Sequence, residues 1–212
     1  MDGLDLLKKD WKKREGSLPQ LSYDQIYKML WKRSSSIVKW IFVISIIEFL
    51  FWALINIFMA DQEYWKEMER IHLKEFTVVI YVINYAITFF FIYCFYKNYR
   101  KISSTDNAAQ LMKNILRTRK TVKYYIGYIL ISTAIVALVY TYFMMDYHVS
   151  TSVVEDIEKY SFTPVQWLIF AGIMIGGLAA FLGIIWLFYR VIYGILLRRL
   201  NKNYKELKKL EV

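Results

Sequence analysis

The stretch IFVISIIEFLFWALINIF, from Ile41 to Phe58, decides the fold of this chain. Its residues are apolar apart from Ser45, Asn56 and one charged residue, Glu48. A helix needs about 20 apolar residues to cross the hydrocarbon core of a bilayer. The stretch does not alternate between polar and apolar residues, as the strand of a membrane barrel would. It therefore predicts a transmembrane helix that carries a carboxyl group near its centre.

The rest of the 212-residue chain repeats this pattern of long apolar runs between charged blocks. The chain is 57% hydrophobic, and its charged residues are sorted into blocks rather than scattered, as they would be in a soluble domain. Only helices and closed barrels satisfy every backbone polar group in lipid. We therefore predict an all-α integral membrane protein with four transmembrane helices, at about 37–59, 76–96, 124–145 and 165–189.

The charged blocks alternate in sign along the chain. Nine Lys/Arg residues occur in 1–39, eight in 97–123 and seven in 190–212, whereas acidic residues outnumber basic ones in 61–75 and 146–159. Short loops rich in Lys and Arg stay in the cytoplasm. The alternation predicts a multi-pass protein of the bacterial inner (plasma) membrane with both termini in the cytoplasm.

The net charge of +10 follows from this orientation rule. Nucleic-acid binding is therefore not needed to explain the basic residues, and we predict no nucleic-acid partner. The partner that the basic blocks predict is a lipid bilayer with anionic headgroups.

Helix signals extend beyond the apolar runs. Ser22 and Gln25 have the spacing of a capping box, and no helix breaker follows before Met59. Pro164 stands at the first position of the last helix. We therefore expect helices that continue into the cytoplasm. The expected organisation is cytoplasmic N-terminal helices in 1–36, a transmembrane bundle in 37–194 and a basic amphipathic tail in 195–212. Within the bundle, 97–123 form a cytoplasmic helical loop.

A charge at the depth of Glu48 costs about 2.5–3.5 kcal/mol on insertion scales. Other polar residues recur along the apolar runs, and hydrogen bonds between them link membrane helices. Asn84 falls at roughly the depth of Glu48. We predict an intramembrane polar seam, in which Glu48 is either a structural hydrogen-bonding residue or a carrier of protons or cations. Its members are Glu48, Asn56, Tyr81, Asn84, Thr88 and Ser132.

Small residues recur at every third or fourth position of the last apolar run: Gly172, Gly176, Ala180 and Gly183. Such faces let helices approach closely. They predict helix packing, either within the bundle or between two copies of the chain in a homodimer.

The sequence lacks the usual residues of catalytic and metal sites. It has two histidines and one cysteine, and we find no P-loop, HExxH or GxSxG motif. We therefore predict no catalytic residue, no metal site and no cofactor.

Two resemblances bear on function. The segments LDLLKKDWKK and LWKRSSSIVKW resemble uncharacterised four-span bacterial inner-membrane proteins, some encoded near extracytoplasmic-function sigma factors. That resemblance assigns no catalytic residue. In outline the chain is also similar to the small multidrug resistance family, in which a glutamate of the first span exchanges protons and cations. Only Glu48 carries over, and this chain is about twice as long as members of that family.

These observations favour a non-enzymatic scaffold, accessory subunit or regulator that meets a protein partner through its cytoplasmic helices. The alternative is a small proton-coupled transporter that uses Glu48.

The orientation is testable by cysteine labelling in a Cys94→Ala background. We expect a membrane-impermeant maleimide to modify Ser150→Cys in intact cells and Lys205→Cys only after permeabilisation, because the acidic loop faces away from the cytoplasm. The reverse pattern would contradict the predicted orientation.

Overall fold

The computed structural model describes residues 8–11, 22–105, 107–152 and 163–210. Residues 8–11 are helical, and no strand occurs in these four segments. The longer elements are α2 (Tyr23–Met59), α3 (Gln62–Arg70), α4 (Lys74–Ser103), α5 (Ala108–Ser152) and α6 (Pro164–Leu210).

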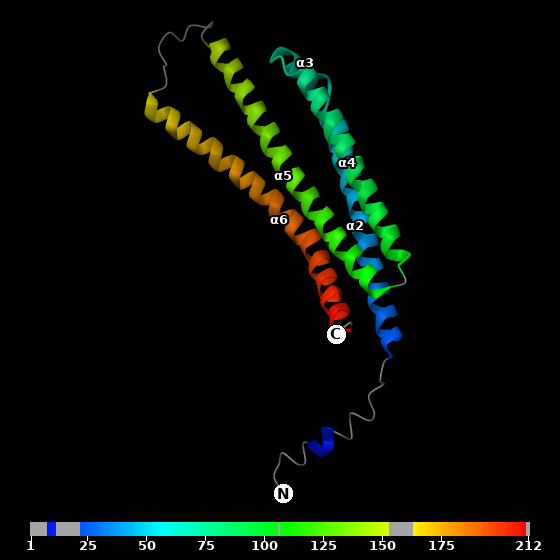
Figure 1. Cartoon of the computed structure of the whole chain (residues 1–212). Helices are drawn as coiled ribbons and strands as arrows, with labels where there is room; N and C mark the ends of the chain where they lie inside the picture. The colour runs from blue at the N-terminus through cyan, green and yellow to red at the C-terminus, as the bar shows by residue number, and fades with distance from the viewer. Residues whose placement is uncertain (1–7, 12–21, 106, 153–162, 211–212) are drawn as a thin grey trace.

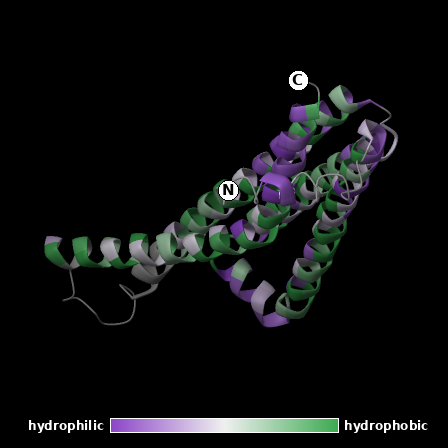
Figure 2. Ribbon diagram, turned by 90° about the horizontal axis from the view of Figure 1, so that it is seen from below, coloured by the Kyte–Doolittle hydropathy of each residue, from purple (hydrophilic) through white to green (hydrophobic). Residues whose placement is uncertain are grey.

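Four helices in the described segments, α2, α4, α5 and α6, are long and apolar enough to cross a membrane, which confirms the expected helical architecture. In Figure 2 their middle stretches are mostly hydrophobic, while the C-terminal part of α6 is mostly hydrophilic.

The helices begin where the sequence predicts. The Ser22 hydroxyl accepts a hydrogen bond from the Gln25 backbone N–H at 3.3 Å, and the Gln25 side chain accepts one from the Ser22 N–H at 3.0 Å. This capping box satisfies two backbone donors at the start of α2. Pro164 is the first residue of α6, where its missing N–H costs nothing. These local signals fix where α2 and α6 begin.

The short helix α3 was not expected from the apolar pattern. The Asp61 side chain caps it by accepting from the Tyr64 N–H at 2.8 Å. His72 then takes a left-handed backbone conformation (φ 56°), and α4 begins at Lys74. Met68, Ile71 and Leu73 bury their side chains together, so α3 packs against the start of α4.

The bundle has two unlike ends. We call the end formed by the start of α2, the α4–α5 turn and the C-terminus of α6 the basic end, and the end that carries α3 the α3 end. In Figure 1 the four long helices lie close together near the C-terminus, and toward the α3 end α6 separates from the other three.

Most of the buried side chains lie in the basic half. One core cluster is built from all four long helices: Leu30, Val38, Ile102, Ala108, Leu111, Ile115, Leu200 and Leu207. The Trp31 Nε1–H donates to the Ile102 carbonyl at 2.9 Å, and the Asn203 amide donates to the Ser34 hydroxyl at 3.0 Å. The predicted boundaries at 36 and 194 fall inside α2 and α6, and the polar extensions pack on one another as a continuation of the bundle.

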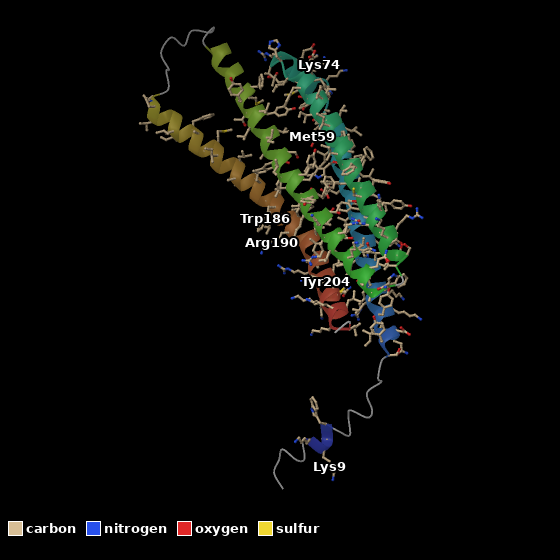
Figure 3. The ribbon with its side chains drawn as sticks, in the orientation of Figure 1. Lys9, Met59, Lys74, Trp186, Arg190 and Tyr204 are labelled. Atoms are coloured by element: carbon tan, nitrogen blue, oxygen red, sulfur yellow. The ribbon has the colours of Figure 1, made fainter. Side chains whose placement is uncertain are left out.

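The other half of α6 has a different environment. Between Pro164 and Phe188, nearly all of its described side chains are exposed. Figure 3 marks Trp186 and Arg190 where this open half gives way to the packed half that contains Tyr204. The chain is therefore closely packed at the basic end and open along α6 toward the α3 end.

Two leucines of α6 test this difference. Leu200 is fully buried and Leu187 is 56% exposed. Replacing a buried leucine by alanine costs about 2–5 kcal/mol. We therefore expect Leu200→Ala to lower the unfolding temperature of the protein in mild detergent, followed by circular dichroism, and Leu187→Ala to leave it nearly unchanged. Equal shifts for both variants would contradict the packing described here.

Candidate functional site

Glu48 lies at the contact of three helices. Its side chain is 9% exposed, and tyrosines from α5 and α6 surround its carboxyl group. The Tyr189 hydroxyl donates to Glu48 Oε1, and the Tyr193 hydroxyl donates to Oε2 at 3.0 Å. The hydroxyl of Tyr125 also interacts with this carboxyl group. We call these four residues the Glu48–tyrosine cluster.

Helix geometry brings the cluster together. Tyr189 and Tyr193 are four residues apart on α6, so both project from one face of the helix. Their rings are stacked, with centroids 5.9 Å apart and planes 19° apart. The Tyr125 ring meets each of them edge-on at 6.1 Å. The three rings form an apolar wall and direct their hydroxyls to one carboxyl group.

This arrangement acts as a link between helices. Both carboxyl oxygens of Glu48 accept hydrogen bonds, which meets the requirement that a buried polar group be paired. Because Glu48 belongs to α2 and its tyrosine donors belong to α6, the bonds join the first long helix to the last. The small exposed fraction leaves water little access to the carboxyl group.

The donors to Glu48 lie outside the residues that the sequence assigned to the polar seam. The sequence places Asn84 at the depth of Glu48, but the residues that contact the carboxyl group are the tyrosines of α5 and α6. Arg190 follows Tyr189, and its guanidinium lies over the Trp186 ring at 4.7 Å. The carboxyl group therefore lies level with the first basic residue of α6. It is at the junction of the packed and open halves of the bundle.

Asn84 and Ser132 belong to a second polar group. The Tyr128 hydroxyl donates to Asn84 Oδ1 at 2.6 Å, which joins α5 to α4. Tyr128 also interacts with the Ser132 hydroxyl. Ser132 donates to the Ile129 carbonyl of its own helix at 3.1 Å.

The remaining seam residues lie apart from both groups. The Tyr81 and Tyr64 hydroxyls are 3.2 Å apart near α3, where burial raises the pKa of Tyr64. The Asn56 amide donates to the Trp52 carbonyl of its own helix at 2.8 Å. Thr88 is half-buried on α4. The predicted seam is thus divided into separate groups and is not a continuous row.

The small residues of α6 do not pack within the bundle. Within the described residues, no atom of another element lies within 4 Å of the position that a Cβ would occupy at Gly172, Gly176 or Gly183. Ala180 is exposed. Packing of this face inside a single chain is therefore wrong, and self-association through it stays a prediction.

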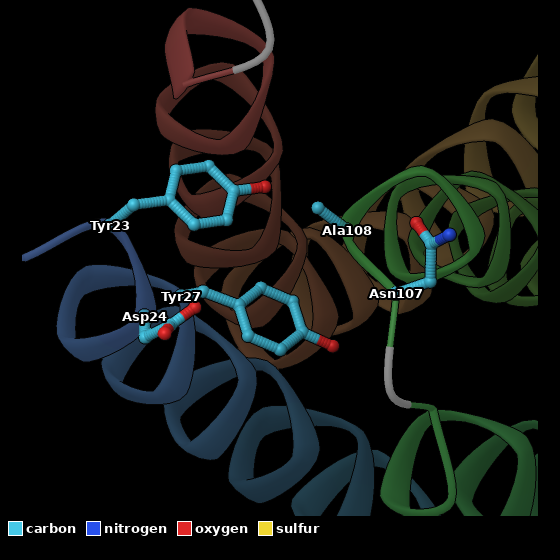
Figure 4. A pocket seen from close by; sticks show the side chains of 5 residues that line it. All are labelled: Tyr23, Asp24, Tyr27, Asn107 and Ala108. Atoms are coloured by element: carbon cyan, nitrogen blue, oxygen red, sulfur yellow. The ribbon is translucent and has the colours of Figure 1, made fainter.

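A shallow hollow of about 280 Å³ lies at the basic end. Figure 4 shows Tyr23, Asp24 and Tyr27 of α2 on one side of it and Asn107 and Ala108 on the other. The Tyr27 hydroxyl donates to the Thr105 carbonyl at 3.0 Å, which fixes the start of α2 against the α4–α5 turn. The hollow therefore has a firm base, while Tyr23 at its rim is 50% exposed.

Sequence reasoning missed the tyrosine donors of the cluster. Tyrosines near the ends of apolar runs, such as Tyr125 and Tyr189, are typical of the membrane–water boundary, where tyrosines are enriched. The spacing of Tyr189 and Tyr193 was the available signal, because it places two hydroxyls on one face of a helix. Nothing local in the sequence indicates that Glu48 of α2 is the acceptor.

Comparison with known proteins gives one match. Residues 24–212 match the model of a family described as a domain of unknown function, DUF8845. Neither the curated proteins nor the solved structures contain a significant match to the chain. The resemblances to the sigma-factor-associated proteins and to the small multidrug resistance family stay predictions.

The Glu48–tyrosine cluster predicts an order of stability among variants. Glu48→Ala leaves two buried tyrosine hydroxyls without their acceptor, and each unsatisfied group costs about 1–3 kcal/mol of folding stability. Glu48→Gln keeps one acceptor oxygen. We expect the unfolding temperature in detergent to be highest for the wild type, lower for Glu48→Gln and lowest for Glu48→Ala.

Tyr193→Phe is the control for this order. It removes one donor, so the further loss caused by Glu48→Ala should be smaller in the Tyr193→Phe background than in the wild type. Fully additive losses would show that the two residues are not coupled.

Proposed function

The chain belongs to the DUF8845 family, and we propose that it is a non-enzymatic multi-pass protein of the bacterial inner membrane. In this proposal it acts as a scaffold, accessory subunit or regulator, and its basic end holds a protein partner at the cytoplasmic face.

One observation carries the proposal: a core of side chains continues beyond the apolar parts of the long helices. Leu30, Leu111 and Leu207 lie in polar, basic stretches, yet they are buried together. A protein that needed only to be anchored in lipid would not require a packed helical bundle beyond its apolar segments. A rigid bundle outside the bilayer provides a fixed surface for another protein.

The charge pattern supports the placement of this bundle in the cytoplasm. The described parts of the basic blocks that belong to the bundle, 22–39, 97–105, 107–123 and 190–210, all lie at or next to the basic end. Lys- and Arg-rich segments remain on the cytoplasmic side of the membrane.

The hollow between α2 and α5 is the surface we assign to the partner. Tyr23 is 50% exposed at its rim. Tyrosine is enriched in protein interfaces, and tyrosines often carry a large part of the binding energy.

Proton-coupled transport through Glu48 is the alternative. An ionisable residue inside an apolar helix favours it, because such residues mark proton and ion paths. The hydrogen bonds to Tyr189 and Tyr193 favour the scaffold instead, since they give both oxygens of Glu48 a partner inside the protein and join α2 to α6. If Glu48→Gln folds and abolishes a pH-dependent binding of substrate, the alternative replaces our proposal.

The partner surface is tested by co-purification from native membranes in mild detergent. We expect Tyr23→Ala to reduce the stoichiometric partner at least fivefold. Tyr124→Ala is the matched control, because Tyr124 is 60% exposed and lies on α5 away from the hollow. A wild-type chain that purifies alone, or a partner lost equally from both variants, would contradict the proposal.

A further inference from the structure

The turn between α4 and α5 carries a cluster of basic side chains. Lys97 and Lys101 are four residues apart on α4, and Lys113 and Arg117 are four residues apart on α5. Residues with this spacing share a face of a helix. We call these four residues the hairpin cations.

Hydrogen bonds between α4 and α5 fix the two pairs beside each other. The Asn98 amide donates to the Thr121 hydroxyl at 3.1 Å, and the Asn114 amide approaches the Lys101 carbonyl at 3.4 Å. Asn98 and Asn114 are both buried, so these contacts hold the two helices in one register. The side chains of the hairpin cations are exposed or half-buried on this rigid support.

The positive charges of the cluster act on one another. The pKa of Lys101 is lowered most by the positive charge of Arg117 and further by the charges of Lys97 and Lys113. Lys101 lies beyond the apolar part of α4. In the part of the chain that the structure describes, no carboxylate forms an ion pair with any of the four. By contrast, Lys74 pairs with Glu69 at 3.0 Å. A bound anion would relieve this repulsion.

The level of the cluster indicates where that anion comes from. The apolar part of α4 ends next to Lys97. Two neighbouring cations lie over tyrosine rings: Arg100 over Tyr96 at 6.0 Å and Lys120 over Tyr124 at 5.5 Å. Aromatic rings concentrate at the level of lipid headgroups, and long basic side chains extend to that level.

We propose that the hairpin cations Lys97, Lys101, Lys113 and Arg117 bind the phosphate of an anionic lipid headgroup. The guanidinium of Arg117 matches two phosphate oxygens, and the lysine ammonium groups act as point charges around the same phosphate. Basic pockets between membrane helices on the cytoplasmic side bind such headgroups. The inference rests on the membrane insertion in the proposed function and is independent of the protein partner.

The test uses the full-length protein in mild detergent and counts bound lipids by native mass spectrometry during titration. The probes are phosphatidylglycerol, the neutral lipid phosphatidylcholine, and inorganic phosphate. Wild type should bind phosphatidylglycerol in preference to phosphatidylcholine. Lys101→Gln/Arg117→Gln should weaken that binding by roughly tenfold to thirtyfold.

Lys28→Gln/Lys32→Gln is the matched control, since it removes the same charge at the same level of the bundle. Both lysines are exposed on α2, and the neighbouring Tyr27 and Trp31 contact Thr105 and Ile102 of the α4 end. Because they lie outside the cluster, we expect this control to change the affinity by less than twofold. If the first site variant does not fold, Lys97→Gln/Lys113→Gln replaces it with the same expected loss.

Three results would overturn the inference: equal weakening in the site variant and the control, no preference for phosphatidylglycerol, or inorganic phosphate that displaces the lipid at equal concentration. The last result would assign the site to free phosphate. These failures differ from those of the proposed function. A chain that does not insert into the membrane would stay soluble without detergent. A missing protein partner would leave lipid binding unchanged.

Discussion

A carboxyl group in an apolar helix needs hydrogen-bond donors from elsewhere in the protein, and this need shapes the centre of the bundle. Glu48 of α2 receives its donors from Tyr189 and Tyr193 of α6, and Tyr125 of α5 closes the cluster. An unpaired buried charge would be costly. The hydrogen bonds therefore hold the first and last long helices together at the point where the bundle changes from packed to open.

The packed and open halves suit different surroundings. At the basic end the helices extend past their apolar stretches and still bury a common core, which includes Ile102, Ile115 and Leu200. Toward the α3 end, α6 turns an apolar surface outward along most of its length. Lipid covers such a surface without cost, whereas a bundle in water must bury its apolar side chains. This contrast is the basis for proposing a membrane part and a cytoplasmic platform in one continuous fold.

Sequence reasoning was most successful where the signal is local. The capping box at Ser22, the start of α6 at Pro164 and the four long apolar helices all agree with the structure. It was least successful for contacts between helices. The sequence did not indicate that Asn84 accepts a hydrogen bond from Tyr128 or that the carboxyl group of Glu48 accepts from tyrosines, and among the described residues no helix packs on the glycine positions of α6.

The sequence by itself determined the four long helices, because hydropathy, caps and breakers act within a few residues along the chain. The tertiary structure alone decided which residues meet. Tyr189 and Tyr193, and not Asn84, donate hydrogen bonds to Glu48, and the hairpin cations form one cluster. These contacts depend on the register and the relative rotation of helices that are distant in sequence. A small shift of one helix along another exchanges the partner of a buried side chain without changing any local pattern.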